Sequence, residues 1–425
     1  MQPAAMKSRL CHAGIALLAA ALPAAAALAD EARSSITLEQ AIALALQHNT
    51  DTRASDQDVV SAHGVLVQAS VLPNPGLFVY SFGSKVAPLE GPIPGQFGVT
   101  WTLPVGGKRS AGIASAEAGL SAAKAGNAAV RQQISLNVAT AFLNVLLSQA
   151  LLEFALQDQA AFRQTLELNE LRYQVGKIAF GDVLKLRLQA LAEDDAVRQV
   201  QQNVVSNRAD LLQLLGENAV KPDFEVKGAL EPVPQVPAVT PETLLSTALD
   251  RRPDYLALGA QTEAASFSLT QARRQLIPDV SVLFDYNHDF GHRAGTPDSY
   301  DVSLSVPVPL FDRNTGNIEQ AAAALEKARI AQEALRIQLR DTATKAVTEW
   351  RSSSAQVQAY RAGVDGARES LEISRHAYEE GRGTLIDFLG AQASYRQVES
   401  AYRSALARTA LAAYTLRFVA AEEIK

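Results

Sequence analysis

Two long stretches of the chain carry the hydrophobic pattern of extended helices. No proline occurs between Pro104 and Pro222, or between Pro309 and residue 425. Within the first stretch, small and apolar residues recur at alternating spacings of four and three, and the second stretch repeats them 205 residues later. This spacing is typical of a coiled-coil seam. The seam positions are Ile134, Val138, Ala141, Val145, Ser148, Leu152 and Ala155, and then Leu339, Ala343, Ala346, Trp350, Ser353, Val357 and Tyr360.

Each stretch is interrupted by a glycine in a related motif. The segments "YQVGKIAFGDVL" (173–184) and "YEEGRGTLIDFL" (378–389) share tyrosine, glycine and aspartate at the same places. A glycine commonly ends a helix, so each motif predicts the turn of an antiparallel helical hairpin. The helix before the first turn, residues 110–175, would extend on the order of 100 Å at about 1.5 Å per residue.

Each hairpin is preceded by a shorter helix and two strands. Thr37 starts the first helix with Gln40 as its capping partner, and Thr240 with Pro241 starts the second. The helices are expected to run to the prolines of "LPNP" (72–75) and "LIPD" (276–279). Three alternating segments then predict strands: "QFGVTWTLP", "VSVLFDY" and "DVSLSVPV". A fourth strand is predicted at "LFVYSF" (77–82), which is apolar on both faces, so its orientation stays open. Alternation fits a half-buried soluble sheet, which the pattern alone favours, and also a strand between lipid and a wet lumen.

The whole arrangement is a duplication. Residues 45–79 align with 248–282 at an offset of 203 without gaps, and from about residue 109 the offset is 205. We therefore predict a first structural repeat at 30–220 and a second at 240–425. The segment 221–239 is rich in proline and predicts an extended connector.

The N-terminal residues have the pattern of a secretory signal. Lys7 and Arg9 precede an apolar stretch, and "ALA" at 27–29 offers a small-residue cleavage site, so 1–29 is predicted to be a signal peptide. The only cysteine, Cys11, lies ahead of the apolar stretch, which argues against a lipoprotein and against disulfides in the exported chain. After residue 30 no run of about 18 apolar residues predicts a transmembrane helix.

The net charge excludes one class of partner. Removing Lys7 and Arg9 from the 39 basic residues leaves 37 against 45 acidic ones, a net charge of −8. Nucleic acid is not an expected partner because phosphate contacts need a basic face.

Four strands are too few to close a membrane barrel, which takes at least about eight. A membrane-inserted chain would therefore have to form an oligomer, because open sheet edges are not stable in lipid.

In this order of elements the chain resembles the TolC family of outer-membrane efflux channels. The resemblance covers essentially all of 36–420 and is carried by both turn motifs and by "TLEQAIALAL", "LPVGGKRSAGIASAEA" and "VPLFDRNTGNIEQA". It implies a mainly α fold with a small β part. It further implies a homotrimer whose 12-stranded barrel in outer-membrane lipid continues as a periplasmic α-helical coiled-coil barrel. The expected partners are a periplasmic membrane-fusion adaptor and an inner-membrane RND-type transporter. "LPNPGLFVYSFG" with "LPVGGKR" resembles the heavy-metal branch of the family.

The resemblance also assigns roles to residues of the two turn motifs. Val175, Gly176 and Gly381 match turn positions that meet the adaptor. Asp182 and Tyr378 match residues that hold the closed mouth by inter-helix hydrogen bonds, and Asp387 matches an acidic ring that narrows the tunnel. A ring of carboxylates would attract cations. Two positions depart from the family pattern: Gly383 stands where many members carry an arginine, and Gly390 stands where a second acidic ring would lie.

Simpler roles for the same residues remain open. Gly176 and Gly381 also fit ordinary helix C-caps. Asp387 lies three residues after Thr384, as in a capping box, and Asp182 lies at a helix start where a negative charge suits the dipole. On pattern alone, Tyr173 and Tyr378 are expected to pack in the seam rather than to form hydrogen-bonded locks.

The sequence offers little metal or catalytic chemistry. His288, Asp289 and His292 are interpreted as a polar loop between strands rather than a metal site. Met1 and Met6 are the only methionines and both lie in the predicted signal, so a thioether relay for Cu(I) is not expected. No nucleophile elbow, phosphate loop or cofactor motif is visible, and we predict neither an enzyme nor a cofactor. The alternatives to a channel are a periplasmic adaptor, which would carry one hairpin, and a coiled-coil scaffold without a pore.

Overall fold

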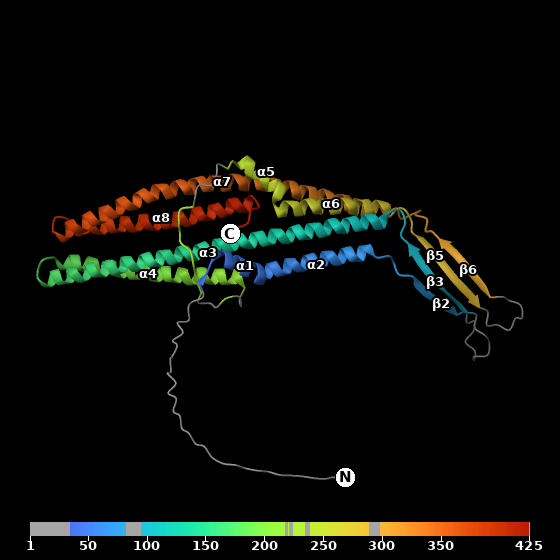
Figure 1. Ribbon diagram of the computed structural model, residues 1–425, viewed down its shortest axis with the longest axis horizontal. Helices are drawn as coiled ribbons and strands as arrows, with labels where there is room; N and C mark the ends of the chain where they lie inside the picture. Colours follow the sequence, from blue (N-terminus) through green and yellow to red (C-terminus); the bar gives the residue numbers. More distant parts are fainter. Residues whose placement is uncertain are drawn as a thin grey trace, which may run out of the picture.

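The computed structural model describes residues 35–81, 95–216, 220, 224–233, 239–288 and 298–424. The molecule is long and narrow, with a β-sheet at one end and helices along the rest of its length (Figure 1). The element order of two helices, two strands and a long helical hairpin occurs twice. This confirms the internal duplication that the sequence predicts.

The two shorter predicted helices are each broken in two. Instead of one helix, α1 (Leu38–His48) is followed by α2 (Thr50–Ser70), and α5 (Pro241–Arg251) is followed by α6 (Pro253–Arg274). Asn49 is the breaking residue in the first repeat: its N–H donates to Ala45 as the end of α1, and its side chain accepts from Asp51 N–H as the start of α2. In the second repeat the N–H of Arg252 likewise donates to the carbonyl of Ala248 at the end of α5, and Pro253 begins α6 without a side-chain cap. The predicted capping box at Thr37 is present, and α5 starts after Thr240 as predicted, with a further capping box between Thr240 and Thr243.

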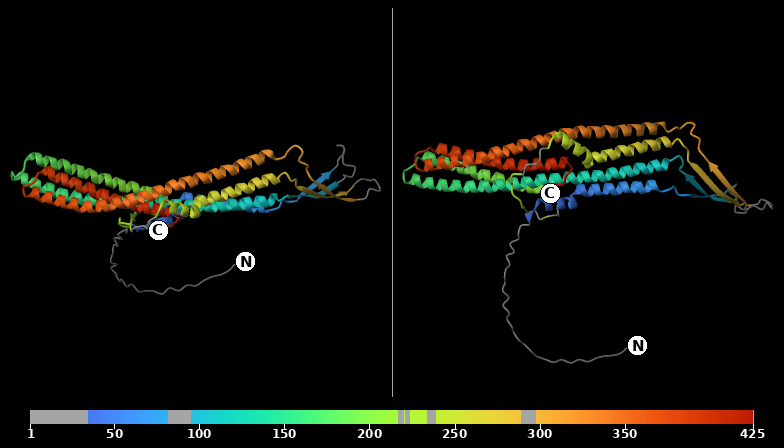
Figure 2. Two further views of the ribbon diagram at one scale, coloured as in Figure 1. Left: turned by 90° about the horizontal axis from the view of Figure 1, so that it is seen from above. Right: turned by 45° about the horizontal axis from the view of Figure 1, so that its top comes forward.

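The two long hairpins are present as predicted. Hairpin 1 consists of α3 (Lys108–Gln174) and α4 (Phe180–Leu215), and hairpin 2 consists of α7 (Thr315–Glu379) and α8 (Leu385–Val419). The views in Figure 2 show them side by side, with both turns at the end of the molecule opposite the sheet. With 67 residues, α3 is about 100 Å long. Most seam positions are buried, among them Val138, Val145, Leu339 and Ala343.

Four antiparallel strands form the sheet at the other end, in the order β2 (Gly76–Ser81), β3 (Gly95–Leu103), β5 (Val280–His288) and β6 (Ser299–Ser305). The last strand is shorter than the sequence pattern predicts. It ends before Pro307, which has no N–H to donate to a sheet ladder. Within the described residues, β2 and β6 are open edges.

The register gives the sheet one apolar and one polar face. Leu77, Val99, Phe284 and Val302 lie opposite one another across the four strands, and the next row holds Phe78, Gly98, Asp285 and Asp301. On the apolar face Leu77 is 84% exposed and Val302 is 70% exposed. A large apolar surface of this kind marks a contact with lipid or with another protein.

A short parallel pair of strands was not predicted. β1 (Ser35–Ile36) pairs with β4 (Glu225–Val226) in the connector between the repeats. Ile36, Phe224 and Val226 pack there into the largest core cluster, together with Phe142 and Leu215. The described part of the connector is therefore tied to the middle of the bundle and is not only an extended linker.

Within the part of the chain that the structure describes, one helix is long and apolar enough to cross a membrane, although the sequence predicted none. It is α3, which contains an 18-residue window of mean hydropathy 1.6. Half of that window is buried against the rest of the molecule. Because α3 is also the central helix of the bundle, this hydropathy is that of a packed core helix.

Candidate functional site

Both hairpin turns are built on the same backbone geometry. Gly176 and Gly381 have φ angles of 73° and 72°. In the first turn, Gly176 N–H donates to Tyr173 O and Lys177 N–H donates to Arg172 O, and the second turn repeats both bonds from Gly381 and Arg382. This is the Schellman arrangement, in which a left-handed residue ends the helix. The C-cap role that the sequence left open for the two glycines is therefore present.

The turn glycines and their neighbour Val175 lie on the surface at the tip. A side chain at Gly176 or Gly381 would meet open space, so backbone conformation alone requires glycine there. Val175 follows the end of α3 and is 69% exposed. All three predicted contact positions are thus accessible to a partner, and their role in contacting an adaptor stays a prediction.

The two departures from the family pattern differ in their surroundings. A Cβ at Gly383 would lie 3.1 Å from the Cβ of Ala377 and 3.2 Å from the carbonyl carbon of the same residue. The last turn of α7 therefore leaves little room for the arginine that many family members carry. At Gly390 a Cβ would meet open space. An acidic side chain would therefore fit at position 390, and lack of space is not the reason that this chain has no second acidic residue there.

The two predicted gate aspartates lie at equivalent helix starts. Asp387 completes a capping box: it accepts hydrogen bonds from Thr384 N–H at 3.3 Å and from Thr384 Oγ1 at 2.6 Å. Asp182 lies in the first turn of α4 and forms an ion pair with Lys185 at 3.5 Å. Asp387 is exposed and Asp182 is partly exposed. Each carboxylate therefore serves its own helix and is also available to a lumen or a neighbouring chain.

Tyr378 forms an inter-helix hydrogen bond with a partner that the sequence did not indicate, and its role in holding a closed mouth stays a prediction. Its hydroxyl donates to Oδ1 of Asn169 on α3 at 2.8 Å, and Asn169 is 1% exposed. Burial raises the pKa of Tyr378 and the nearby negative charge of Asp182 raises it further, whereas Arg172 lowers it. The Tyr378 hydroxyl therefore keeps its proton and can donate it to Asn169. Asp182 affects Tyr378 through its negative charge, and its described ion pair is with Lys185 on its own helix, α4.

The counterpart in the first repeat behaves differently. Tyr173 is 42% exposed, and its ring contacts Phe180 with centroids 5.6 Å apart. Tyr378 instead stacks on Phe388 at 5.8 Å with nearly parallel rings. Only the second repeat places its tyrosine between the hairpins.

Further contacts join the two hairpins at the tip. Arg172 donates to the Glu379 carbonyl at 2.9 Å, which connects one turn to the other. Behind this bond, Phe162, Leu186, Leu385 and Phe388 form a buried apolar cluster that draws on both hairpins. The two turns of one chain therefore form a single packed tip.

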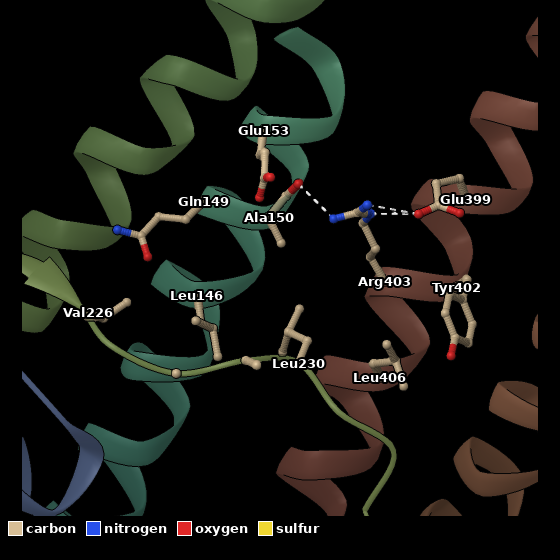
Figure 3. A pocket seen from close by; sticks show the side chains of 12 residues that line it. Leu146, Gln149, Ala150, Glu153, Val226, Leu230, Glu399, Tyr402, Arg403 and Leu406 are labelled. Carbon is tan, nitrogen blue, oxygen red and sulfur yellow. Dashed lines mark hydrogen bonds and ion pairs between the residues drawn. The ribbon is translucent and has the colours of Figure 1, made fainter. Parts of the chain in front are cut away.

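The hairpins are also connected near the middle of the molecule. A cavity of about 480 Å³ lies between α3, α8 and the connector (Figure 3). On its wall, Arg403 of α8 donates to the carbonyl of Ala150 on α3 at 3.1 Å and pairs with Glu399 on its own helix at 2.9 Å. Leu230 of the connector packs beside Leu406. This contact fixes the two hairpins relative to each other below the tip.

At the sheet end, the polar face carries a hydrogen-bonded acidic pair. Asp285 accepts from Gln96 at 2.5 Å and from Asn287 at 3.0 Å, and Asn287 also donates to Asp301 at 2.7 Å. Gly98 allows this row to form, because a Cβ there would lie 2.7 Å from the Cβ of Asp285. Within the described ranges no group of three or more histidine, cysteine or acidic side chains is arranged to hold a metal ion. Asp289 and His292 lie outside the described residues.

Comparison with known proteins places the chain in a family. Residues 17–217 and 244–422 match the outer membrane efflux protein family, and the chain belongs to that family. The resemblance to the TolC family of outer-membrane efflux channels is thereby confirmed.

Individual relatives agree with this assignment over most of the chain. The cobalt-zinc-cadmium resistance protein CzcC of Cupriavidus metallidurans is 28% identical over 91% of this chain and 90% of its own length. The nickel-cobalt-cadmium resistance protein NccC of Alcaligenes xylosoxydans is 26% identical over 82% of this chain and 76% of its own length. A solved structure of CusC has a TM-score of 0.78 at 17% identity, covering 92% of this chain and 93% of that one.

Proposed function

We propose that this protein is the outer-membrane duct of a tripartite efflux system and that it works as a homotrimer. The observation that carries the proposal is the four-stranded sheet with one exposed apolar face, one polar face and two open edges. Three copies would supply twelve strands, enough to close a barrel with its apolar face toward lipid and its polar face toward a lumen. The long hairpins would continue that barrel as a helical tunnel through the periplasm.

The hairpin tips are the proposed mouth and docking site. We assign the adaptor contact to Val175, Gly176 and Gly381, because the turns are exposed at the far end from the sheet. The closed mouth would be held by Tyr378 with Asn169, and Asp182 and Asp387 would supply carboxylates around the narrow lumen. An inner-membrane RND-type transporter would deliver the cargo through the adaptor.

The proposed cargo is divalent metal cations. Two of the relatives are named for resistance to cobalt, cadmium, zinc or nickel. In this chain the acidic side chains Asp285 and Asp301 on the polar sheet face, and Asp387 at the tip, would favour cations over anions along the path. A metal-sensitivity panel on a strain lacking the gene tests the cargo: sensitivity to one or more divalent metals is expected, and sensitivity to organic compounds only would contradict it.

The channel itself is tested by fractionation. The protein is expected in the outer membrane and, without heating, to migrate as an oligomer. An adaptor or a scaffold would not fractionate in this way. The two hairpins and the exposed apolar strand face favour the channel over both alternatives, since an adaptor would carry one hairpin and a scaffold needs no apolar sheet surface.

A further inference from the structure

A buried polar cluster connects the two hairpins below the tip. Its α3 residue, Asp158, lies 16 residues before the end of that helix at Gln174, which is roughly 24 Å at about 1.5 Å per residue. Asp158 of α3, Glu193 of α4 and Gln392 with Arg396 of α8 meet there. The side chains of Asp158 and Glu193 are 9% and 5% exposed, and Gln392 is 5% exposed. Charged side chains that are so deeply buried require close partners.

The cluster has more negative than positive charge. Arg396 pairs closely with Glu193, and its Nε lies 3.6 Å from Oδ2 of Asp158. One guanidinium thus faces two carboxylates. Gln189 adds a neutral donor to Glu193 at 2.7 Å.

The neighbouring α7 does not correct this imbalance. Glu372, Arg375 and Glu379 line a cavity of about 260 Å³ beside Asp158, and Arg375 is paired with Glu372. Among the described residues of this cavity, α7 therefore contributes two carboxylates and one guanidinium, which adds no net positive charge beside Asp158. Two carboxylates held this close in a buried place favour the retention of one proton.

Two polar atoms of the cluster lack a hydrogen bond, and they belong to one pair of side chains. Gln392 Nε2 donates to Oδ1 of Asp158 at 3.3 Å. Oδ2 of Asp158 and Oε1 of Gln392 are both buried without a hydrogen-bond partner. Both atoms are acceptors when Asp158 is ionised, so neither can satisfy the other. A proton on Asp158 gives the acid an O–H that can donate to the amide oxygen, and acid and amide then form two bonds in one ring.

We propose that Asp158 is a proton-binding site and that the protonated acid, paired with Gln392, latches hairpin 1 to hairpin 2. Burial is the main cause that raises the pKa of Asp158, and Glu193 raises it further, whereas Gln392 and Arg396 lower it. The folded pKa lies above the unfolded value of 3.8. The stabilisation is therefore complete at low pH and is lost as the pH rises through the folded pKa. The latch would make the tip sensitive to acidification of the periplasm. Only this consequence rests on the proposed function.

The variant Asp158→Asn tests the latch, because asparagine presents the same donor and acceptor as the protonated acid at every pH. Thermal and denaturant unfolding of the purified full-length protein would be compared with this variant from the unfolded pKa of 3.8 upward to about pH 8. Wild type is expected to lose stability relative to Asp158→Asn as the pH rises, by up to about tenfold in the unfolding equilibrium constant per pH unit. A ratio that stays constant with pH would overturn the proposal.

A matched control and a direct readout accompany this test. Asp194 neighbours Glu193 on α4, and its pKa is lowered by hydrogen bonds from Arg163 and Gln159. Relative to Asp194→Asn, the wild type is therefore not expected to lose stability as the pH rises. Infrared difference spectra should show a protonated-acid carbonyl band in wild type that shifts in Gln392→Leu and is absent from Asp158→Asn. Absence of that band from wild type across the pH range would also overturn the proposal, including when Asp158→Asn fails to fold.

The latch and the proposed channel can fail separately. A protein that fractionates with the outer membrane as an oligomer but shows no pH-dependent difference contradicts only the latch. A water-soluble single chain with the expected infrared band contradicts only the channel.

Discussion

Removing one hydroxyl group at the tip is expected to loosen the mouth. Tyr378→Phe keeps the ring that stacks on Phe388 but leaves Oδ1 of Asn169 without its donor. Because Asn169 is 1% exposed, water cannot replace the lost bond without rearrangement. An unsatisfied buried acceptor costs about 1–3 kcal/mol. At about 1.4 kcal/mol per factor of ten, one chain would shift a closed–open equilibrium by roughly 5- to 150-fold.

Single-channel recording in planar bilayers measures this shift. Tyr378→Phe is expected to raise the conductance or the open probability. Since the pKa of Tyr378 is raised above its usual value of 10.0, the hydroxyl donates throughout the physiological range and the effect of the substitution should not vary with pH there. Tyr173→Phe is the matched control, because Tyr173 is 42% exposed and contacts Phe180 through its ring. If both conductance and open probability are unchanged in Tyr378→Phe, or if both variants change equally, the reasoning is refuted.

Three further substitutions and one control test the roles of individual side chains. Asp387→Asn retains an acceptor for Thr384, so the free energy of unfolding should change by less than about 0.5 kcal/mol. The cation preference of the channel, measured from reversal potentials, should fall. Lost stability with unchanged ion selectivity would mean that Asp387 acts only as a helix cap. Gly381→Ala forces alanine to φ 72° and should cost roughly 1–2 kcal/mol in chemical unfolding; no loss would mean that the turn can adopt another conformation. Asp279→Asn removes the partner of Lys108, whose side chain is 8% exposed, and should cost roughly 2–3 kcal/mol, because Asp279 is itself partly exposed. The exposed Asp341→Asn should cost below about 0.5 kcal/mol, and equal losses in these two variants would contradict the burial argument.

Long periodic elements were predictable from the sequence because their signals repeat many times. The spacing of four and three fixed the seam of α3 and α7, and the paired glycines located both turns within a few residues. The strands were located by alternation, except that β6 ends before Pro307. Duplication strengthened each assignment, since each predicted helix and strand had a counterpart in the other repeat.

The missed features depend on single residues or on distant partners. The break at Asn49 has one local signal, the cap on Asp51 N–H, and one distant partner, the carbonyl of Leu214 165 residues away, which receives a hydrogen bond from the Asn49 amide and which no local pattern indicates. Pro253 was a usable signal for the equivalent break in the second repeat. The pairing of β1 with β4 involves only two residues on each side. Asn169 lies inside a helix with no motif around it, and only the packing of hairpin 2 against hairpin 1 identifies it as the partner of Tyr378.

The central claim is that identical chains combine their four-stranded sheets into one closed barrel in lipid. Native mass spectrometry of the detergent-solubilised protein, taken from the outer-membrane fraction, tests it most directly. The predicted result is a complex of three chains that requires detergent to stay in solution. A single chain that remains soluble and monodisperse without detergent would contradict it.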